Sequence, residues 1–150
     1  MERRLARCRS IVNIFGNRVV PGERKTMECK SNILIVEDTA EIREYLCHVL
    51  QNAGFEVCGC EDGASALDAA KESIFQVIII DYCMPNISGA DATRRLRERF
   101  PVSFIIGVSS NDKKEDFLAA GADAFLLKPY RSVDIINLIN GSNKLRPRIP

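Results

Sequence analysis

VIIIDYCMP, residues 77–85, is the stretch that decides the fold of this chain. Its four β-branched residues in a row predict a strand buried on both faces, as in a parallel sheet. The run ends on the carboxylate of Asp81, and the residues from Met84 to Gly89 predict a turn. Asp81 is therefore expected at the carboxyl end of a central strand, the edge at which open α/β sheets bind ligands. Taken alone, such an aspartate is more often a turn or helix-capping residue.

Short apolar runs and helical periodicity alternate along the rest of the folded part. The runs that predict strands lie at 33–36, 55–60, 77–80, 103–108 and 124–127. Helices are predicted over 39–53, 64–74, 90–100, 112–120 and 131–140, with Thr39 as an N-cap and Gly54, Gly121 and Gly141 as stops. The basic residues of the third helix, Arg94, Arg95, Arg97 and Arg99, are most simply a solvated face. We predict an α/β, flavodoxin-like (βα)5 three-layer sandwich with a parallel five-stranded sheet in the order 2-1-3-4-5.

Polar side chains follow four of these strands at their carboxyl ends. They are Glu37 and Asp38, Asp81, Ser109 and Lys128. In the predicted strand order these groups converge on one pocket. Three carboxylates in one place repel each other unless a cation joins them, and hard oxygen ligands suit Mg²⁺. A lysine and a hydroxyl beside them suit phosphoryl transfer to a carboxylate nucleophile. No phosphate-binding glycine motif of a nucleotide site occurs.

The motifs at these strand ends resemble a known family. ILIVED at 33–38, IIDYCMP at 79–85 with Gly89, VSS at 108–110, GAD at 121–123 and FLLKPY at 125–130 are similar to the receiver domain (CheY-like) of two-component response regulators. The resemblance spans residues 31–141, although the segment between Ser109 and Gly121 is shorter than is usual in the family.

The resemblance implies a role for each site residue. Asp81 would accept a phosphoryl group from a sensor-kinase phosphohistidine. Asp38 would bind Mg²⁺ directly, Glu37 would act largely through water, and the main-chain carbonyl of Cys83 would be a further ligand. Lys128, in a cis bond to Pro129, would pair with the phosphate. Ser109 and Phe125 would then move together and switch the partner-binding face between the fourth and last helices; Phe125 as a fixed core residue is the alternative.

The same resemblance defines the expected activity and partners. The donor would be a sensor histidine kinase or a phosphotransfer protein, and the target an unidentified downstream protein. We expect no enzymatic activity beyond self-phosphorylation and slow autodephosphorylation. The competing interpretations are a receiver fragment of a larger regulator or hybrid kinase, a degenerate receiver, and a small Mg²⁺-dependent aspartyl phosphatase. The phosphatase class needs a second carboxylate two residues after the nucleophile, where this chain has Cys83.

Charge separates the chain into parts. Residues 1–30 carry eight Lys and Arg and three Glu, so they are basic. Residues 31–150 carry thirteen Lys and Arg and seventeen acidic residues, so they are acidic. The acidic body argues against direct nucleic-acid binding. We expect residues 1–30 to be a disordered leader or an over-extended start before Met27, with a basic binding arm as the alternative. Residues 142–150 are expected to form a basic tail, with no output domain in this chain.

Two further expectations concern metal sites and location. The six cysteines form no C-x-x-C pair and there is a single histidine, so the usual spacings of a zinc site are absent. No stretch approaches 18 apolar residues, and we therefore expect no membrane insertion. The cysteine pattern favours a reducing, cytoplasmic location.

Overall fold

The computed structural model describes residues 32–145, with side chains up to residue 142. The expected leader and the end of the expected tail lie outside the described residues. Strands and helices alternate within this range. They are β1 (Asn32–Val36), α1 (Ala40–Asn52), β2 (Glu56–Cys60), α2 (Gly63–Glu72), β3 (Val77–Asp81), α3 (Gly89–Arg99), β4 (Phe104–Ser109), α4 (Lys114–Ala120), β5 (Ala124–Leu127) and α5 (Ser132–Leu145).

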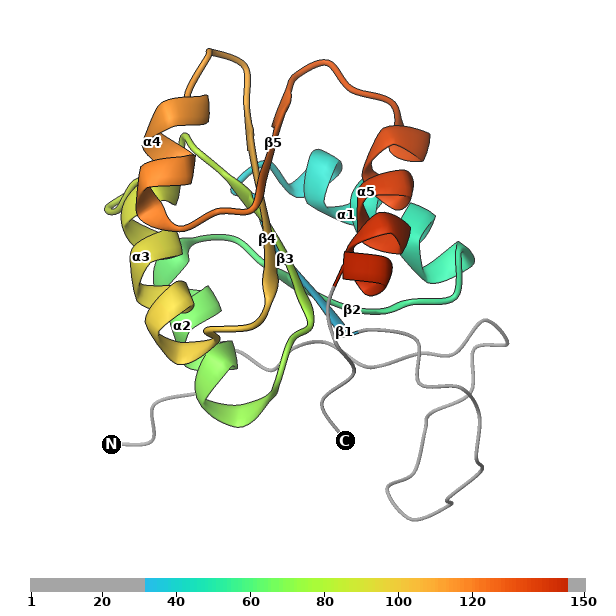
Figure 1. Cartoon of the computed structure of the whole chain (residues 1–150), viewed down its shortest axis with the longest axis horizontal. Coiled ribbons are helices and arrows are strands. Elements are labelled where there is room, and N and C mark those ends of the chain that lie inside the picture. Colours follow the sequence, from blue (N-terminus) through green and yellow to red (C-terminus); the bar gives the residue numbers. More distant parts are fainter. Residues whose placement is uncertain (1–31, 146–150) are drawn as a thin grey trace.

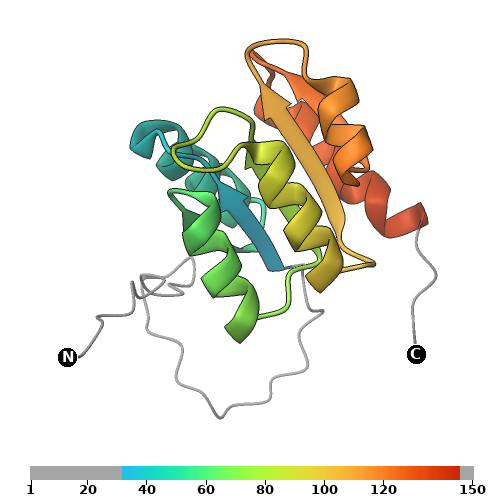
Figure 2. The same ribbon diagram turned by 90° about the vertical axis from the view of Figure 1, so that its left-hand side faces the viewer.

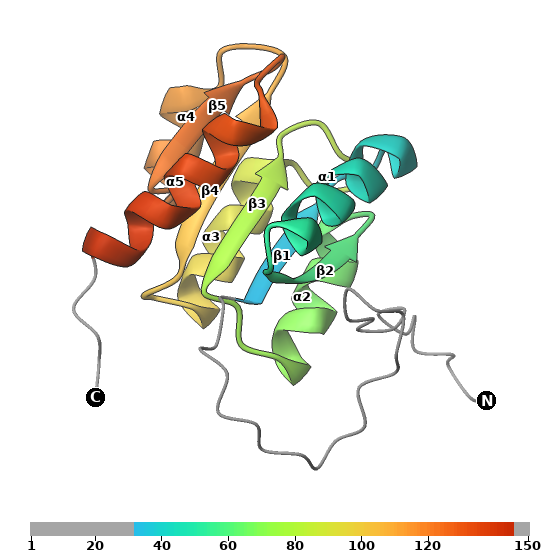
Figure 3. The same cartoon turned by 90° about the vertical axis from the view of Figure 1, so that its right-hand side faces the viewer.

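The five strands form one parallel sheet in the order β2-β1-β3-β4-β5, which confirms the predicted topology. Helices α2, α3 and α4 cover one face, and α1 and α5 cover the other (Figure 1). Figure 2 faces the side of α2, α3 and α4, drawn in green, yellow and orange in front of the strands. Figure 3 faces the opposite side, where α1 and α5 cross the sheet. These are the three layers of the predicted sandwich.

The alternation of side chains along the strands builds a core on each face of the sheet. Ile78 and Ile80 of β3 point into the core under α2, α3 and α4, together with Leu34, Leu96 and Phe117. The neighbouring Ile79 packs instead against α1 and α5. All five residues of β3 are buried. A central strand covered on both faces is apolar up to its carboxyl end, here from Val77 to Ile80, which is why an unbroken apolar run marks it in the sequence.

Glycine ends two of the helices as predicted. Gly54, after α1, has a φ of 91°, and Gly121, after α4, has a φ of 103°. These left-handed conformations favour glycine because they strain residues with a Cβ atom. Thr39 occupies the N-cap position of α1 as predicted, but its side chain makes no capping hydrogen bond.

Two predicted helix ends are wrong. Helix α5 does not stop at Gly141 but continues to Leu145. Gly141 is not among the residues with positive φ, so it lacks the backbone turn by which glycine terminates a helix. Helix α2 ends at Glu72 and not at the predicted residue 74, and Ile74 is an exposed residue of the following loop.

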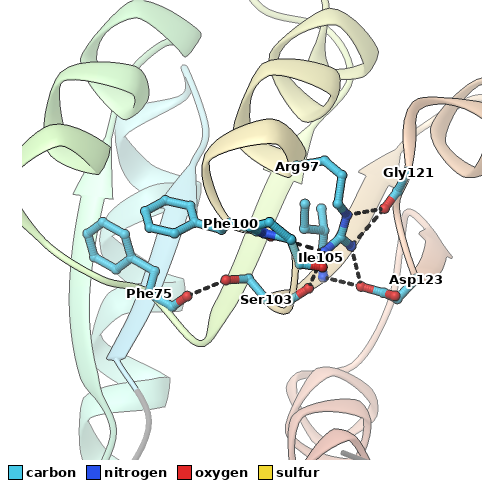
Figure 4. Close-up of polar contacts among 8 residues, drawn as sticks. Phe75, Arg97, Phe100, Ser103, Ile105, Gly121 and Asp123 are labelled. Carbon is cyan, nitrogen blue, oxygen red and sulfur yellow. Dashed lines mark hydrogen bonds and ion pairs between the residues drawn. The ribbon is translucent and has the colours of Figure 1, made fainter.

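The basic face predicted for α3 is also only partly solvated. The guanidinium of Arg97 donates to the carbonyl oxygens of Gly121 (2.7 Å and 2.9 Å), Ser103 (2.7 Å) and Phe100 (3.2 Å) and pairs with Asp123 (2.7 Å; Figure 4). Arg97 therefore ties the end of α3 to the start of β4 and to the α4–β5 loop. This use of the side chain needs contacts far apart in sequence, which a charge pattern does not contain.

Among residues 32–145, none of the helices combines the length and the apolar character that crossing a membrane requires.

Candidate functional site

The predicted site residues meet at one edge of the sheet. Asp81 is the last residue of β3, Ser109 is the last residue of β4, and Glu37 and Lys128 directly follow β1 and β5. Because all strands are parallel, their carboxyl ends lie together at the upper edge in Figure 1. The chain therefore brings together polar residues that are up to 91 positions apart.

Three carboxylates form the acidic part of the site. One oxygen from each of Glu37, Asp38 and Asp81 lies within 4.8 Å of the others. Glu37 is 2% exposed and Asp81 is 5% exposed, whereas Asp38 lies at the surface. Two of the three negative charges are thus largely removed from water, which is unfavourable unless a cation compensates them.

Lys128 supplies part of that compensation. Its Nζ lies 2.8 Å from Oδ1 of Asp81 and 3.0 Å from Oε2 of Glu37. Burial alone would lower the pKa of Lys128, but its bonds to the two carboxylates outweigh burial and raise that pKa. The pKa of Glu37 is also raised, chiefly by burial, against the opposing effect of the Lys128 hydrogen bond. One ammonium beside three carboxylates leaves the site with a net negative charge.

The donor set fits a divalent cation. Clustered carboxylate oxygens, with one acid open to solvent, are the hard ligands that Mg²⁺ binds while it keeps several waters. Asp38 is the exposed member, and among the described residues it makes no ion pair. A divalent cation bound by these carboxylate oxygens would offset the net negative charge that remains after Lys128 is counted.

The loop after β3 forms one wall of the site. Cys83 is exposed there and helps to line a shallow cavity of about 510 Å³, together with Asp38, Tyr82 and Met84. Gly89 brings the loop back to the strand, since its N–H donates to the Tyr82 carbonyl at 2.9 Å. A Cβ atom at Gly89 would overlap the Asp81 carbonyl oxygen, so this close approach requires glycine.

The two predicted switch residues lie on β4 and β5, Ser109 as the last residue of β4 and Phe125 as the second residue of β5. Ser109 is buried, and its Oγ accepts a hydrogen bond from the N–H of Asn111 at 3.1 Å. Phe125 is half-buried, with its ring 6.0 Å from that of Phe117. The backbone N–H of Lys128 donates to the Ser109 carbonyl at 2.8 Å, and the Lys128–Pro129 bond is cis, as expected.

Sequence reasoning missed two residues that contact this site. Arg43 of α1 donates from its guanidinium to the main-chain carbonyl of Glu37. Tyr82, directly after Asp81, donates from its phenol to Asp116 of α4. Arg43 lies one helical turn after Thr39, where its reach to the loop could have been considered. For the bond from Tyr82 to Asp116 no local signal exists, because the partners are 34 residues apart.

Comparison with known proteins agrees with this arrangement. The family model described as the response regulator receiver domain matches residues 33–140. The transcriptional regulatory protein YrkP of Bacillus subtilis is 34% identical over 105 residues, which are 69% of this chain and 45% of YrkP. The sensory transduction protein RegX3 of Mycolicibacterium smegmatis is 34% identical over 109 residues, 71% of this chain and 47% of RegX3. This chain thus spans about half the length of these relatives.

Solved structures show the same fold. The chemotaxis response regulator CheY4 of Vibrio cholerae superposes with a TM-score of 0.71 at 30% identity, covering 75% of this chain and 98% of CheY4. The response regulator TrrA of Thermotoga maritima, solved in complex with Mg²⁺ and BeF, gives a TM-score of 0.69 at 26% identity, with 75% and 98% covered. The match of the family model, the strand order and the cluster of polar residues at the strand ends agree, and the chain belongs to the response regulator receiver domain family.

Proposed function

We propose that this chain is a phosphoacceptor of a two-component phosphorelay, with Asp81 as the accepting residue. The observation that carries the proposal is the setting of the Asp81 carboxylate, which is buried, 2.8 Å from the Lys128 ammonium and within 4.8 Å of two further acids. A carboxylate beside a lysine and a candidate cation site is equipped to attack phosphorus.

The transfer that we propose uses a phosphohistidine donor on a sensor kinase or phosphotransfer protein. An oxygen of Asp81 forms a bond to phosphorus as the P–N bond of the donor breaks, and the electron pair returns to the imidazole nitrogen. The product is an acyl phosphate on Asp81. Water later attacks the phosphorus and releases inorganic phosphate, which restores the carboxylate. The chain is thus proposed to turn over only its own phosphoryl group.

Asp38, Asp81 and the Cys83 carbonyl would hold Mg²⁺, with Glu37 acting largely through water. Bound there, the ion would screen the negative charge of the transferred group. Lys128, already placed on Asp81, would pair with a phosphoryl oxygen once the acid has become an acyl phosphate. Ser109 carries a hydroxyl at the end of the adjacent strand and would donate to another phosphoryl oxygen.

We propose that phosphorylation is transmitted to partners through α4, β5 and α5. Phe125 of β5 pairs with Gly107 of β4, two residues before Ser109, and packs on Phe117 of α4, so a movement of Ser109 and Phe125 can reach that surface. The surface exposes Leu118, Leu127 and Val133, one large apolar side chain from each element. Apolar residues on a charged surface are suited to binding a protein partner. We also propose a cytoplasmic location.

A labelling experiment tests the proposal. The chain is incubated with Mg²⁺ and acetyl phosphate, or with a phosphorylated histidine kinase, and separated on a phosphate-affinity gel. Because the chain has no tryptophan, the gel replaces an intrinsic tryptophan signal. We expect a Mg²⁺-dependent shift in the wild type that Asp81→Asn abolishes and Asp68→Asn, an exposed aspartate of α2, retains. A shift that persists in Asp81→Asn, or none from either donor, would contradict the proposal.

A further inference from the structure

Arg43 makes an unusual contact with the backbone that carries two of the acids. Its Nη1 atom donates to the carbonyl oxygen of Glu37 at 2.7 Å and lies 3.4 Å from that of Asp38. These are the peptide groups that immediately follow the two acidic residues. A charged donor gives a stronger hydrogen bond to a carbonyl than a neutral donor does. The guanidinium thus restrains the orientation of both peptide planes in the β1–α1 loop.

The neighbouring strand leaves space for this side chain. A Cβ atom built on Gly59 of β2 would lie 3.2 Å from Cγ and 3.3 Å from Cδ of Arg43, and 3.1 Å from Sγ of Cys47. Gly59 does not have positive φ, so its backbone does not demand glycine. The missing side chain instead gives the arginine stem room as it reaches toward the loop after β1.

Asp38 is the acid that depends most on this restraint. Glu37 is held by Lys128 and also accepts a hydrogen bond from the N–H of Thr39 at 3.2 Å. Asp81 is fixed at the end of a buried strand and pairs with Lys128. Asp38 is exposed, and among the described residues no cation holds its carboxylate. Its direction is therefore set by the backbone that Arg43 holds.

We propose that Arg43 is a positioning residue for the divalent-cation site, which acts by holding the Glu37–Asp38 backbone so that Asp38 faces the other acids, and that Gly59 provides the space for it. The inference rests on the proposed function, because it assigns Arg43 to the cation site of that receiver. Partners that orient metal ligands without touching the metal commonly alter affinity by about 10–100-fold when they are removed.

The sign of the effect separates positioning from charge. Arg43 is a cation close to a site for a cation, so simple Coulomb repulsion predicts that its removal tightens Mg²⁺ binding. Positioning predicts the opposite, because a loosely held Asp38 must be ordered when the ion binds. A weaker Mg²⁺ affinity in a variant that has lost a positive charge is therefore evidence for positioning.

The experiment is a titration of the full chain with MgCl₂, followed by the amide NMR signals of residues 37–39 and 81–83. We expect Arg43→Ala to raise the Mg²⁺ dissociation constant about 10-fold. Arg43→Lys should recover part of the loss, since an ammonium can bond one carbonyl but lacks the fork of the guanidinium. Arg95→Ala, which removes the same charge from an exposed position of α3, should leave the constant unchanged.

Gly59→Ala provides a second variant that keeps every charge. Its methyl group crowds the Arg43 stem, so we expect weaker Mg²⁺ binding in the same direction. The double variant Arg43→Ala with Gly59→Ala should be no weaker than Arg43→Ala alone, because both changes remove one interaction. Acetyl phosphate labelling should need more Mg²⁺ in these variants but reach the wild-type level at saturation, whereas Asp81→Asn stays unlabelled.

An unchanged or tighter Mg²⁺ constant in folded Arg43→Ala would overturn the inference while the proposed function stands. If Arg43→Ala does not fold, the result for Gly59→Ala decides, and wild-type affinity there overturns it. If the wild type itself neither binds Mg²⁺ nor becomes labelled, the proposed function fails, and the inference fails with it.

Discussion

The phenol of Tyr82 donates a hydrogen bond of 3.0 Å to Oδ2 of Asp116 and so links the residue after Asp81 directly to α4. The Lys113 ammonium lies 4.9 Å from the centre of the Tyr82 ring, and the Phe117 ring meets it edge-on with centroids 5.6 Å apart. The hydrogen bond to Asp116 is the main cause that raises the pKa of the phenol. This contact joins the β3 loop to α4 without passing through Ser109 or Phe125.

Tyr82→Phe should therefore loosen α4 while it preserves the aromatic packing. We expect a small loss in the free energy of unfolding, because one hydrogen bond at the surface is removed. Amide hydrogen exchange over 114–120 should become faster. Tyr45→Phe is the control, since Tyr45 is an exposed phenol on α1 at the other face of the sheet. Unchanged exchange in α4 of Tyr82→Phe would show that the hydrogen bond does not restrain the helix.

Arg97→Ala should destabilise the fold much more than the removal of an exposed surface charge does. The variant removes the guanidinium donor from several main-chain carbonyls, including those of Ser103 and Gly121. We expect a loss of about 2–4 kcal/mol, measured by urea unfolding, because hydrogen bonds from a charged donor are removed from a partly buried position.

Arg94→Ala is the matched control for this measurement. Arg94 lies on the same helix, and within the described part of the chain its one ion pair is with Asp91, one turn away and exposed. Such pairs contribute about 0–1 kcal/mol. Equal losses in the two variants would mean that the Arg97 contacts do not stabilise the native state.

The sequence was sufficient to predict the sheet order and the convergence of the site residues, because both depend on local signals. An apolar run ending in a polar residue marks where a buried strand reaches its edge, as at Asp81, and the connection rules then bring the edges together. The partners of Arg97, Arg43 and Tyr82 could not be predicted in this way. They depend on which surfaces meet after folding, and the side chains of Arg97 and Tyr82 reach residues 24 to 34 positions away.

The three predicted helix-ending glycines also show that a residue type alone does not determine where a helix ends. Gly54, Gly121 and Gly141 were all predicted to end helices, but only the first two adopt positive φ. A glycine permits a left-handed turn without requiring it, and the choice at Gly141 is made by the packing of α5 on the sheet through residues such as Ile139.

Gly107→Ala should destabilise the protein by overpacking. A Cβ atom at this position of β4 would overlap the ring of Phe117, which is fully buried against it. We expect a loss of about 1–3 kcal/mol in the free energy of unfolding. Phe117→Leu in the Gly107→Ala background should recover part of the loss, because the smaller side chain frees the space. A Gly107→Ala variant as stable as the wild type would contradict this account of the packing.

The opposite sign is expected for Gly141→Ala. Gly141 lies inside α5, and a Cβ atom there would meet no atom within 4 Å. Alanine should raise the free energy of unfolding by about 0.5–1 kcal/mol, since it restricts the unfolded chain and favours the helix. Comparison with Gly107→Ala separates two effects on the free energy of unfolding: the steric overlap of an added Cβ atom and the backbone preference of alanine for a helix.

Asp62 should give a pH-dependent contribution to stability. Its carboxylate caps α2 by accepting hydrogen bonds from the N–H of Ser65 at 2.7 Å and from the Ser65 hydroxyl at 2.5 Å. These bonds, the hydroxyl first, lower the pKa of Asp62 from its ordinary value of 3.8. Because the folded state has the lower pKa, the contribution is fully present above the ordinary value and is lost as pH falls through the folded one.

Asp62→Ala should therefore cost about 1 kcal/mol at pH 7, the usual effect of losing a cap, and less as the pH falls below about 4. Asp62→Asn is the control, because its amide oxygen can still cap the helix but the side chain does not titrate. Thermal unfolding of the three proteins between pH 7 and pH 3 gives the comparison. A difference between wild type and Asp62→Ala that grows as the pH falls would show that the charged form is not the one that the helix stabilises.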